Sequence, residues 1–185
     1  MFGDAFTAGT VPGGLNSTTD INILICVLLY RTGSLYRDDI LEAISGTGSA
    51  NYFEAADALN ESEQKGNAVC DSNGFYSLTA SGINICESLE SDLPLTVREK
   101  VISEAERLAD FRRKSKTNKV DIVPDGKGGY CFTGKVLNAE GNADLEIKLI
   151  LPTRETAEKA SEKFISDAEY LERTVIEFLM NEKID

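Results

Sequence analysis

The chain has 185 residues, of which 42% are hydrophobic and 27% charged, a composition typical of a globular protein. Acidic side chains outnumber basic ones by 31 to 19, and the net charge of −12 argues against a surface that binds nucleic acid or anionic membrane throughout. Histidine is absent, which excludes serine-hydrolase triads and histidine-based zinc sites within one chain. We therefore expect a protein that is not an enzyme and that holds no metal or cofactor.

The cysteines and the N-terminal segment predict the compartment. No CxxC pair occurs, and the thiols lie in apolar or alternating segments, where we expect them to be buried and reduced. The cysteines are Cys26, Cys70, Cys86 and Cys131. No basic residue precedes an apolar core at the N-terminus, and the longest apolar run, residues 21–30, is half the ~20 residues of a membrane span. We expect a cytoplasmic protein without membrane contact.

The first predicted elements are helices. A flexible leader covers residues 1–17, and Thr18, Thr19 and Asp20 then supply the N-cap of a helix that is apolar almost all round to Tyr30. Such a helix must be central in its domain. A second helix is predicted over residues 35–44. Its inward residues are Ile40, Leu41 and Ile44, and its outward residues are Arg37, Asp38 and Asp39.

A third helix and a hairpin follow. Asn51 caps a helix over residues 51–65, with Glu54 placed for a capping box. Strand candidates at residues 68–71 and 75–78 flank Asn73 and Gly74, a strong hairpin signal. On the helix, Tyr52, Ala55, Ala56 and Leu59 share one face, and Glu54, Asp57 and Glu61 share the opposite one. Thr79 caps a further helix, and this order of elements is that of a winged helix-turn-helix.

The second half has an α+β pattern. A longer helix runs from Val97 to about Lys114, and its apolar stripe from Val97 to Leu108 is our candidate for dimerisation. Alternating segments at residues 130–137 and 145–151 predict an antiparallel hairpin, with a third strand at 119–123. A final helix begins at Pro152-Thr153, and its stripe from Ala157 to Leu179 either covers this sheet, which we favour, or forms a dimer seam.

The predicted fold class is therefore α+β, with an N-terminal winged helix-turn-helix, a linker helix, and a small β-hairpin or sheet with a long C-terminal helix. The expected divisions are the leader at 1–17, the winged-helix domain at 18–93, the linker helix at 94–118 and the C-terminal domain at 119–185.

A resemblance enters at residues 76–82, YSLTASG, which match Y-x-L-T-x-x-G and resemble the end of the wing in many bacterial winged-helix regulators. More of the chain is similar to an uncharacterised bacterial winged-helix family that carries a domain-of-unknown-function label. The similar stretches are 5–9, 12–15, 20–30, 51–54 and the C-terminal hairpin and helix through 151–153. The resemblance implies a transcriptional-regulator fold and provides no ligand, target or reaction.

If the chain reads double-stranded DNA, the helix at 51–65 is the recognition helix and nearby cations neutralise phosphates. The expected DNA contacts are Tyr52, Phe53 and Gln64 on the helix, Asn73 on the wing, and Arg112, Arg113 and Lys114 at phosphates. The charge opposes this interpretation, because residues 1–97 hold 3 basic and 13 acidic side chains. Residues 98–185, with 16 and 18, are nearly balanced.

The reconciling hypothesis is a homodimer in which a basic stretch flanks the duplex. We call Arg107, Arg112, Arg113, Lys114, Lys116 and Lys119 the basic stretch. These cations also fit a charged helix end and linker, which is the interpretation that we favour for the stretch taken alone.

The alternative function is a winged helix repurposed as a protein-interaction module. Its acidic helix face, Glu54, Asp57 and Glu61, would recognise a partner with a basic surface. In a monomer the same carboxylates also fit a solvent-exposed helix face. Under the first hypothesis the C-terminal domain serves assembly or signal sensing.

Overall fold

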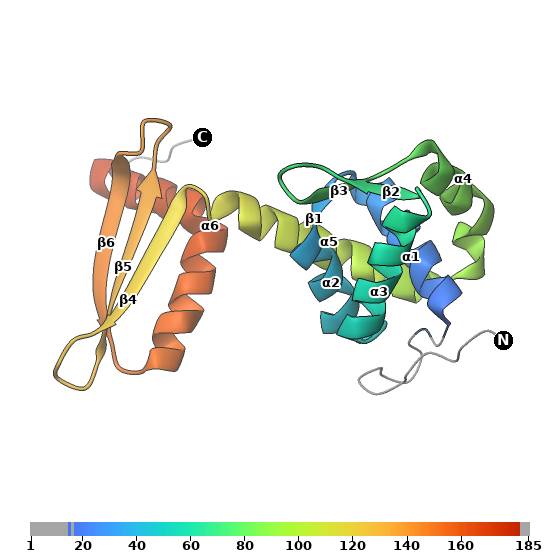
Figure 1. Cartoon of the computed structure of the whole chain (residues 1–185). Helices are drawn as coiled ribbons and strands as arrows, with labels where there is room; N and C mark the ends of the chain where they lie inside the picture. The colour runs from blue at the N-terminus through green and yellow to red at the C-terminus, as the bar shows by residue number, and fades with distance from the viewer. Residues whose placement is uncertain (1–14, 16, 182–185) are drawn as a thin grey trace. The chain divides into compact units, whose positions relative to one another are not determined.

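The computed structural model describes residue 15 and residues 17–181. The chain divides into two compact units, Met1–Ala109 and Asp110–Asp185, and their boundary falls inside helix α5 (Leu95–Lys114) (Figure 1). The predicted leader lies outside the described residues except for Leu15 and Ser17. Leu15 is buried, and its backbone N–H donates to the carbonyl of Ser49 at 2.8 Å.

The first unit has the element order and strand pairing of a winged helix. The elements are α1 (Thr18–Thr32), β1 (Leu35–Tyr36), α2 (Arg37–Gly46), α3 (Tyr52–Gln64), β2 (Ala68–Cys70), β3 (Phe75–Leu78), α4 (Ala80–Leu89) and the 3-10 turn η1 (Glu90–Asp92). The three strands form an antiparallel sheet in the order β1-β3-β2. The predicted α+β class and the order of helices and hairpin are thus confirmed.

Helix α1 is the centre of the first core. Ile21 and residues 23–29 are all buried, which explains why the helix is apolar on nearly every side. Its N-cap is Ser17, one residue before the predicted cap, and the Ser17 hydroxyl accepts from the N–H of Thr19 at 3.2 Å. Helix α1 packs against α3 and α4.

Helix α5 completes this core. Val97, Val101 and Ala105 are buried in the same cluster as α1. The prediction that this stripe is the dimerisation surface is therefore wrong, because the earlier helices alone do not close the winged-helix core. The side chain of Lys100 also donates to the carbonyl of Thr47, which ties α5 to the end of α2.

The predicted helix at residues 35–44 needs two corrections. Leu35 and Tyr36 form strand β1, which pairs with Tyr76 and Phe75 of β3, so the helix begins at Arg37. A two-residue strand has no detectable period of its own, and the partner strand decides its conformation. Asp39, expected to point outward, is 5% exposed. The inward residues Ile40, Leu41 and Ile44 are confirmed.

The wing motif, residues 76–82, packs α4 closely against the end of α3. The hydroxyl of Thr79 accepts from the N–H of Gly82 at 3.3 Å and donates to the carbonyl of Gly66 at 2.6 Å, so it caps α4 and ties it to the end of α3. A Cβ on Gly82 would lie 2.2 Å from the carbonyl oxygen of Asn67. Glycine is required here because α4 approaches the backbone of Asn67 closely.

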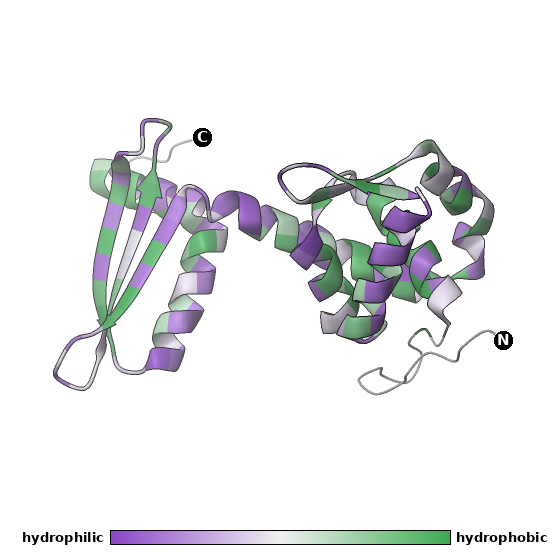
Figure 2. Ribbon diagram, viewed as in Figure 1, coloured by the Kyte–Doolittle hydropathy of each residue, from purple (hydrophilic) through white to green (hydrophobic). Residues whose placement is uncertain are grey.

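The second unit is a three-stranded antiparallel sheet with one long helix on one face (Figure 1). Its elements are β4 (Asn118–Pro124), β5 (Tyr130–Leu137), β6 (Ala143–Leu151) and α6 (Arg154–Met180), in the strand order β4-β5-β6. Hydropathy alternates along the strands (Figure 2), as expected when one face is buried and the other meets solvent. The predicted third strand and the covering helix are confirmed.

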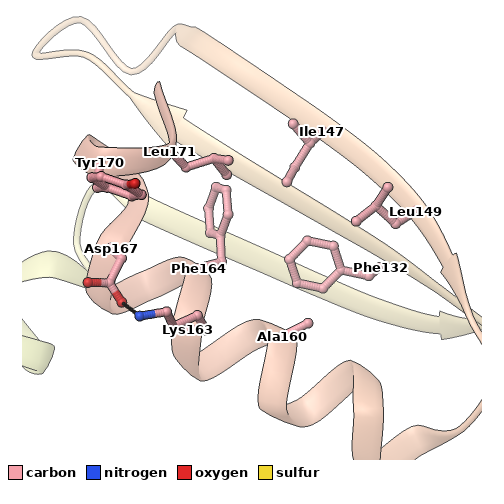
Figure 3. A pocket seen from close by; sticks show the side chains of 9 residues that line it. All are labelled: Phe132, Ile147, Leu149, Ala160, Lys163, Phe164, Asp167, Tyr170 and Leu171. Atoms are coloured by element: carbon pink, nitrogen blue, oxygen red, sulfur yellow. Dashed lines mark ion pairs between the residues drawn. The ribbon is translucent and has the colours of Figure 1, made fainter. Parts of the chain in front are cut away.

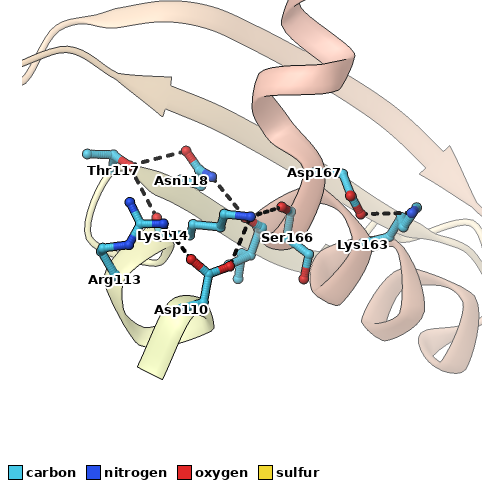
Figure 4. Close-up of polar contacts among 9 residues, drawn as sticks. Asp110, Arg113, Lys114, Thr117, Asn118, Lys163, Ser166 and Asp167 are labelled. Carbon is cyan, nitrogen blue, oxygen red and sulfur yellow. Dashed lines mark hydrogen bonds and ion pairs between the residues drawn. The ribbon is translucent and has the colours of Figure 1, made fainter. Parts of the chain in front are cut away.

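Helix α6 is broken at Asp167, where φ is −125° and ψ is 22°. Two buried or half-buried polar side chains from the start of the unit satisfy carbonyls at the break (Figure 4). Asn118 donates to the carbonyl of Ile165 at 2.9 Å, and Lys114 donates to the carbonyl of Ser166 at 2.7 Å. The carbonyl groups exposed by the break therefore have hydrogen-bond partners within the unit.

Among the described residues, none of the helices has the length and apolar character that a membrane span requires.

Candidate functional site

Helix α3 presents a mixed aromatic and polar outer surface. Ala55, Ala58, Leu59 and Ser62 form its buried side. Phe53 is 78% exposed and Tyr52 45% exposed, and their rings meet edge to face with centroids 5.9 Å apart. Asp57, Asn60 and Gln64 continue the exposed surface along the helix. The predicted helix contacts Tyr52, Phe53 and Gln64 are thus all accessible.

The three carboxylates assigned to an acidic face have different surroundings. Asp57 is exposed, whereas Glu54 is half-buried and has one enclosed oxygen with no hydrogen-bond partner in the described residues. Glu61 accepts from the side-chain amide of Asn22 at 2.8 Å and pairs with Lys65 at 2.6 Å. These contacts, that with Lys65 foremost, lower the pKa of Glu61. Only Asp57 therefore offers an exposed and uncommitted carboxylate among the three.

The wing is a short, rigid turn. The carboxylate of Asp71 accepts from the N–H groups of Phe75 at 2.9 Å and Asn73 at 2.8 Å, and these bonds lower its pKa. Gly74 has a φ of 84°, and a Cβ there would lie 3.0 Å from the ring of Tyr36. Asn73 is exposed at the tip of the turn. The wing therefore presents a polar tip, held by its own aspartate, beside β1.

Arg37 is a cation beside the wing, a position that the sequence does not predict. Because β1 pairs with β3, the backbone N–H of Arg37 lies 3.3 Å from the carbonyl oxygen of Gly74, next to the wing. Its side chain is half-buried, and no described residue forms an ion pair with it. The local pattern predicts helix for residues 35–36, so the sequence alone does not place Arg37 beside the wing.

The other basic side chains of the first unit are engaged by their own chain. Arg31 and Arg98 both pair with Glu90, and Lys65 pairs with Glu61. Arg107 makes two hydrogen bonds to Glu104, at 2.9 and 2.7 Å. Fewer basic side chains of the first unit are therefore available to an external anion than the sequence contains.

The basic stretch divides into structural and accessible members (Figure 4). Lys114 is 25% exposed, pairs with Asp110 at 3.0 Å and holds the break of α6, so its ammonium has a structural role. Arg113 is 72% exposed and pairs with the half-exposed Asp110, a kind of contact worth ~0–1 kcal/mol that an external anion can replace. Lys119 donates to the carbonyl of Ser115. Arg112 is half-buried and has a partner.

The cysteines are free thiols, of which Cys26, Cys86 and Cys131 are buried and Cys70 is half-buried. Burial raises the pKa of the Cys26 thiol to about 11, which suits an inert core residue. Within residues 15 and 17–181, no cluster of three or more cysteine, aspartate or glutamate side chains is placed to hold a metal ion.

The sequence matches the family described as a domain of unknown function, DUF4364, over residues 21–179, so the chain belongs to that family. This confirms the resemblance to an uncharacterised family, although the stretches quoted before residue 15 lie outside both the match and the described residues. No significant match was found among curated proteins or among solved structures.

Proposed function

We propose that this DUF4364 protein is a non-enzymatic regulator that binds double-stranded DNA as a homodimer, through α3 and the wing of its winged helix. The observation that carries the proposal is the exposed surface of α3 beside the wing. Phe53 and Gln64 lie on that surface, Asn73 occupies the wing tip, and Arg37 lies next to the wing. A helix with polar and aromatic side chains facing outward beside a β-hairpin is a common DNA-reading arrangement.

The phosphate contacts come from few residues. Arg37 is unpaired among the described residues, and Arg113 exchanges an exposed aspartate for a phosphate at low cost. One chain therefore supplies a small number of contacts, and a two-fold dimer doubles them. This is why the proposal includes dimerisation, despite the acidic first half.

The test is a titration of the full chain against a fluorescein-labelled pool of random duplexes at about 50 and 200 mM salt. Arg37→Ala and Arg113→Ala should each weaken binding. Each should also reduce the slope of log Kd against log salt by the amount that corresponds to the loss of about one phosphate contact per chain. Arg154→Ala is the matched control, because Arg154 is 74% exposed and forms a similar helical pair with Glu158. It should leave the titration unchanged.

Absence of duplex binding at the lower salt would remove the proposal. Equal weakening by Arg154→Ala would show that the binding is nonspecific attraction to any surface cation. Sedimentation of the same samples measures the dimer, and a monomer at binding concentrations would remove the doubled contacts on which the proposal depends.

A second function, a protein-interaction module, is favoured by one observation. The exposed Tyr52 and Phe53 rings lie on the same helix as the exposed carboxylate of Asp57, and aromatic anchors beside a charge suit a partner with a basic surface. Asp57→Lys separates the two functions. It should strengthen duplex binding by removing repulsion, whereas it should weaken contact with a basic partner, represented by a lysine-rich peptide.

A further inference from the structure

The second unit contains an apolar cavity of about 370 Å³ between its sheet and α6 (Figure 3). Phe132 and Phe164 form its floor, are 1% and 5% exposed, and meet edge to face at 5.9 Å. Leu149 of β6 and Tyr170 of α6 form its rim, and they remain 49% and 65% exposed. Ala160 of α6 also lines the cavity.

The cavity follows from the break in α6. The helix packs chiefly on β4 and β5, and Phe164 rests on Gly134, where a Cβ would lie 2.8 Å from its ring. The chain turns at Asp167, so the apolar side chains of β6 that face the helix are only partly covered. Because Asn118 and Lys114 satisfy the carbonyls at the break, the cavity is preformed.

The polar groups at its edge determine what it would accept. Lys163 and Asp167 pair with each other at 2.8 Å, so their charges cancel (Figure 3). The rest of the wall is almost entirely apolar, apart from the hydroxyl of Tyr170. A charged ligand would lose its hydration without a partner, at a cost of several kcal/mol. An uncharged apolar molecule avoids that cost.

We propose that this cavity binds an uncharged, predominantly apolar small molecule of one or two rings. Its volume lies within the ~300–1,000 Å³ of ligand pockets and is more than twice the ~150 Å³ that holds benzene. Two fixed aromatic rings offer edge-to-face contacts to such a ligand. Of the two roles expected of the C-terminal domain, assembly or signal sensing, the inference gives a ligand class to the second, and in that respect it rests on the proposed function.

The experiment is a fluorescence titration of the full chain with prodan, an uncharged probe with a single two-ring naphthalene system, whose emission shifts to shorter wavelength in apolar sites. Wild type should bind in a saturable manner with one probe per chain. Ala160→Phe fills the cavity and should weaken binding at least tenfold. Ile150→Phe is the matched control. Ile150 is 61% exposed, and because it follows Leu149 in the strand, its side chain lies on the face of the sheet opposite the cavity. It should bind as wild type does.

Leu149→Lys is the second variant if Ala160→Phe does not fold, since Leu149 is half-exposed and a charge there should also weaken binding at least tenfold. The proposal is overturned if wild type shows no saturable binding, or if both cavity variants bind the probe as tightly as wild type does. Wild-type probe binding that appears only at concentrations where the chain is monomeric also overturns it, because a second copy would then be the occupant of the site. If the chain binds the probe but not the duplex, this inference stands and the regulator proposal fails. If the chain binds the duplex but not the probe, only this inference fails.

Discussion

Replacing Gly82 with alanine should destabilise the winged-helix unit by about 2 kcal/mol. The new Cβ would lie 2.2 Å from the carbonyl oxygen of Asn67 and 2.6 Å from a methyl group of Leu78. The methyl group can move, but the oxygen belongs to the backbone, so α4 must shift by about an ångström. Such overpacking costs ~1–3 kcal/mol and sometimes more, while the better helix propensity of alanine returns up to ~1 kcal/mol.

Gly46→Ala is the matched control for this prediction. Gly46 ends α2 in the same unit, and a Cβ there would meet only the carboxylate end of Glu42, at 3.2 Å. It should change the free energy of unfolding by less than ~0.5 kcal/mol. Urea unfolding followed by circular dichroism, with each transition of the full chain fitted separately, measures both variants. A Gly82→Ala protein as stable as Gly46→Ala would refute the argument that close approach requires glycine in the wing motif.

Three further predictions concern the two cores. Gly134→Ala should destabilise the second unit by ~1–3 kcal/mol through contact with the ring of Phe164, and a double-mutant cycle with Phe164→Leu should recover part of the loss in urea unfolding. Asn118→Ala should cost ~1–3 kcal/mol in the same assay by leaving a carbonyl at the break of α6 unpaired, whereas substitution of a solvent-exposed residue of α6 should not. Burial raises the pKa of Cys26 from 9.0 to about 11, so the folded chain keeps a proton that the unfolded chain releases. The contribution of Cys26 to the free energy of unfolding should therefore be nearly constant below about pH 9 and smaller by about 2 kcal/mol near pH 10.5, and Cys26→Ala should remove this part of the decline.

The elements that the sequence predicts well are those with local signals. The apolar residues of α1, interrupted only by Asn22 between Ile21 and Leu29, and the alternation in β5 and β6 identify their elements without reference to distant segments. The Asn73-Gly74 turn and the Thr79 cap likewise depend on neighbouring residues. Tyr52, Phe53, Gln64 and Asn73 are exposed as expected, because residues on the outer side of a short helix or at a hairpin tip seldom find a cover.

The candidate site is less predictable where charge is concerned. The side chains of Arg113 and Lys114 are adjacent in the sequence, yet one is exposed beside Asp110 and the other supports the break in α6. Among the carboxylates of α3, Glu61 is committed to Asn22 and Lys65. A charge count treats these groups as equal, whereas their availability depends on which polar atoms the fold brings within about 3 Å.

Local patterns in the sequence are enough to identify the order of the helices and of every strand except β1, the central position of α1 and the acidic character of the first half. These follow from periodicity, turn residues and composition, which are properties of a segment. Long-range contacts establish that residues 35–36 form a strand and place Arg37 beside the wing. They also establish that α5 closes the first core, and that α6 breaks at Asp167 and leaves a cavity. Each of these depends on contacts between residues far apart in the chain, where the partner segment, and not the local pattern, determines the conformation of lowest free energy.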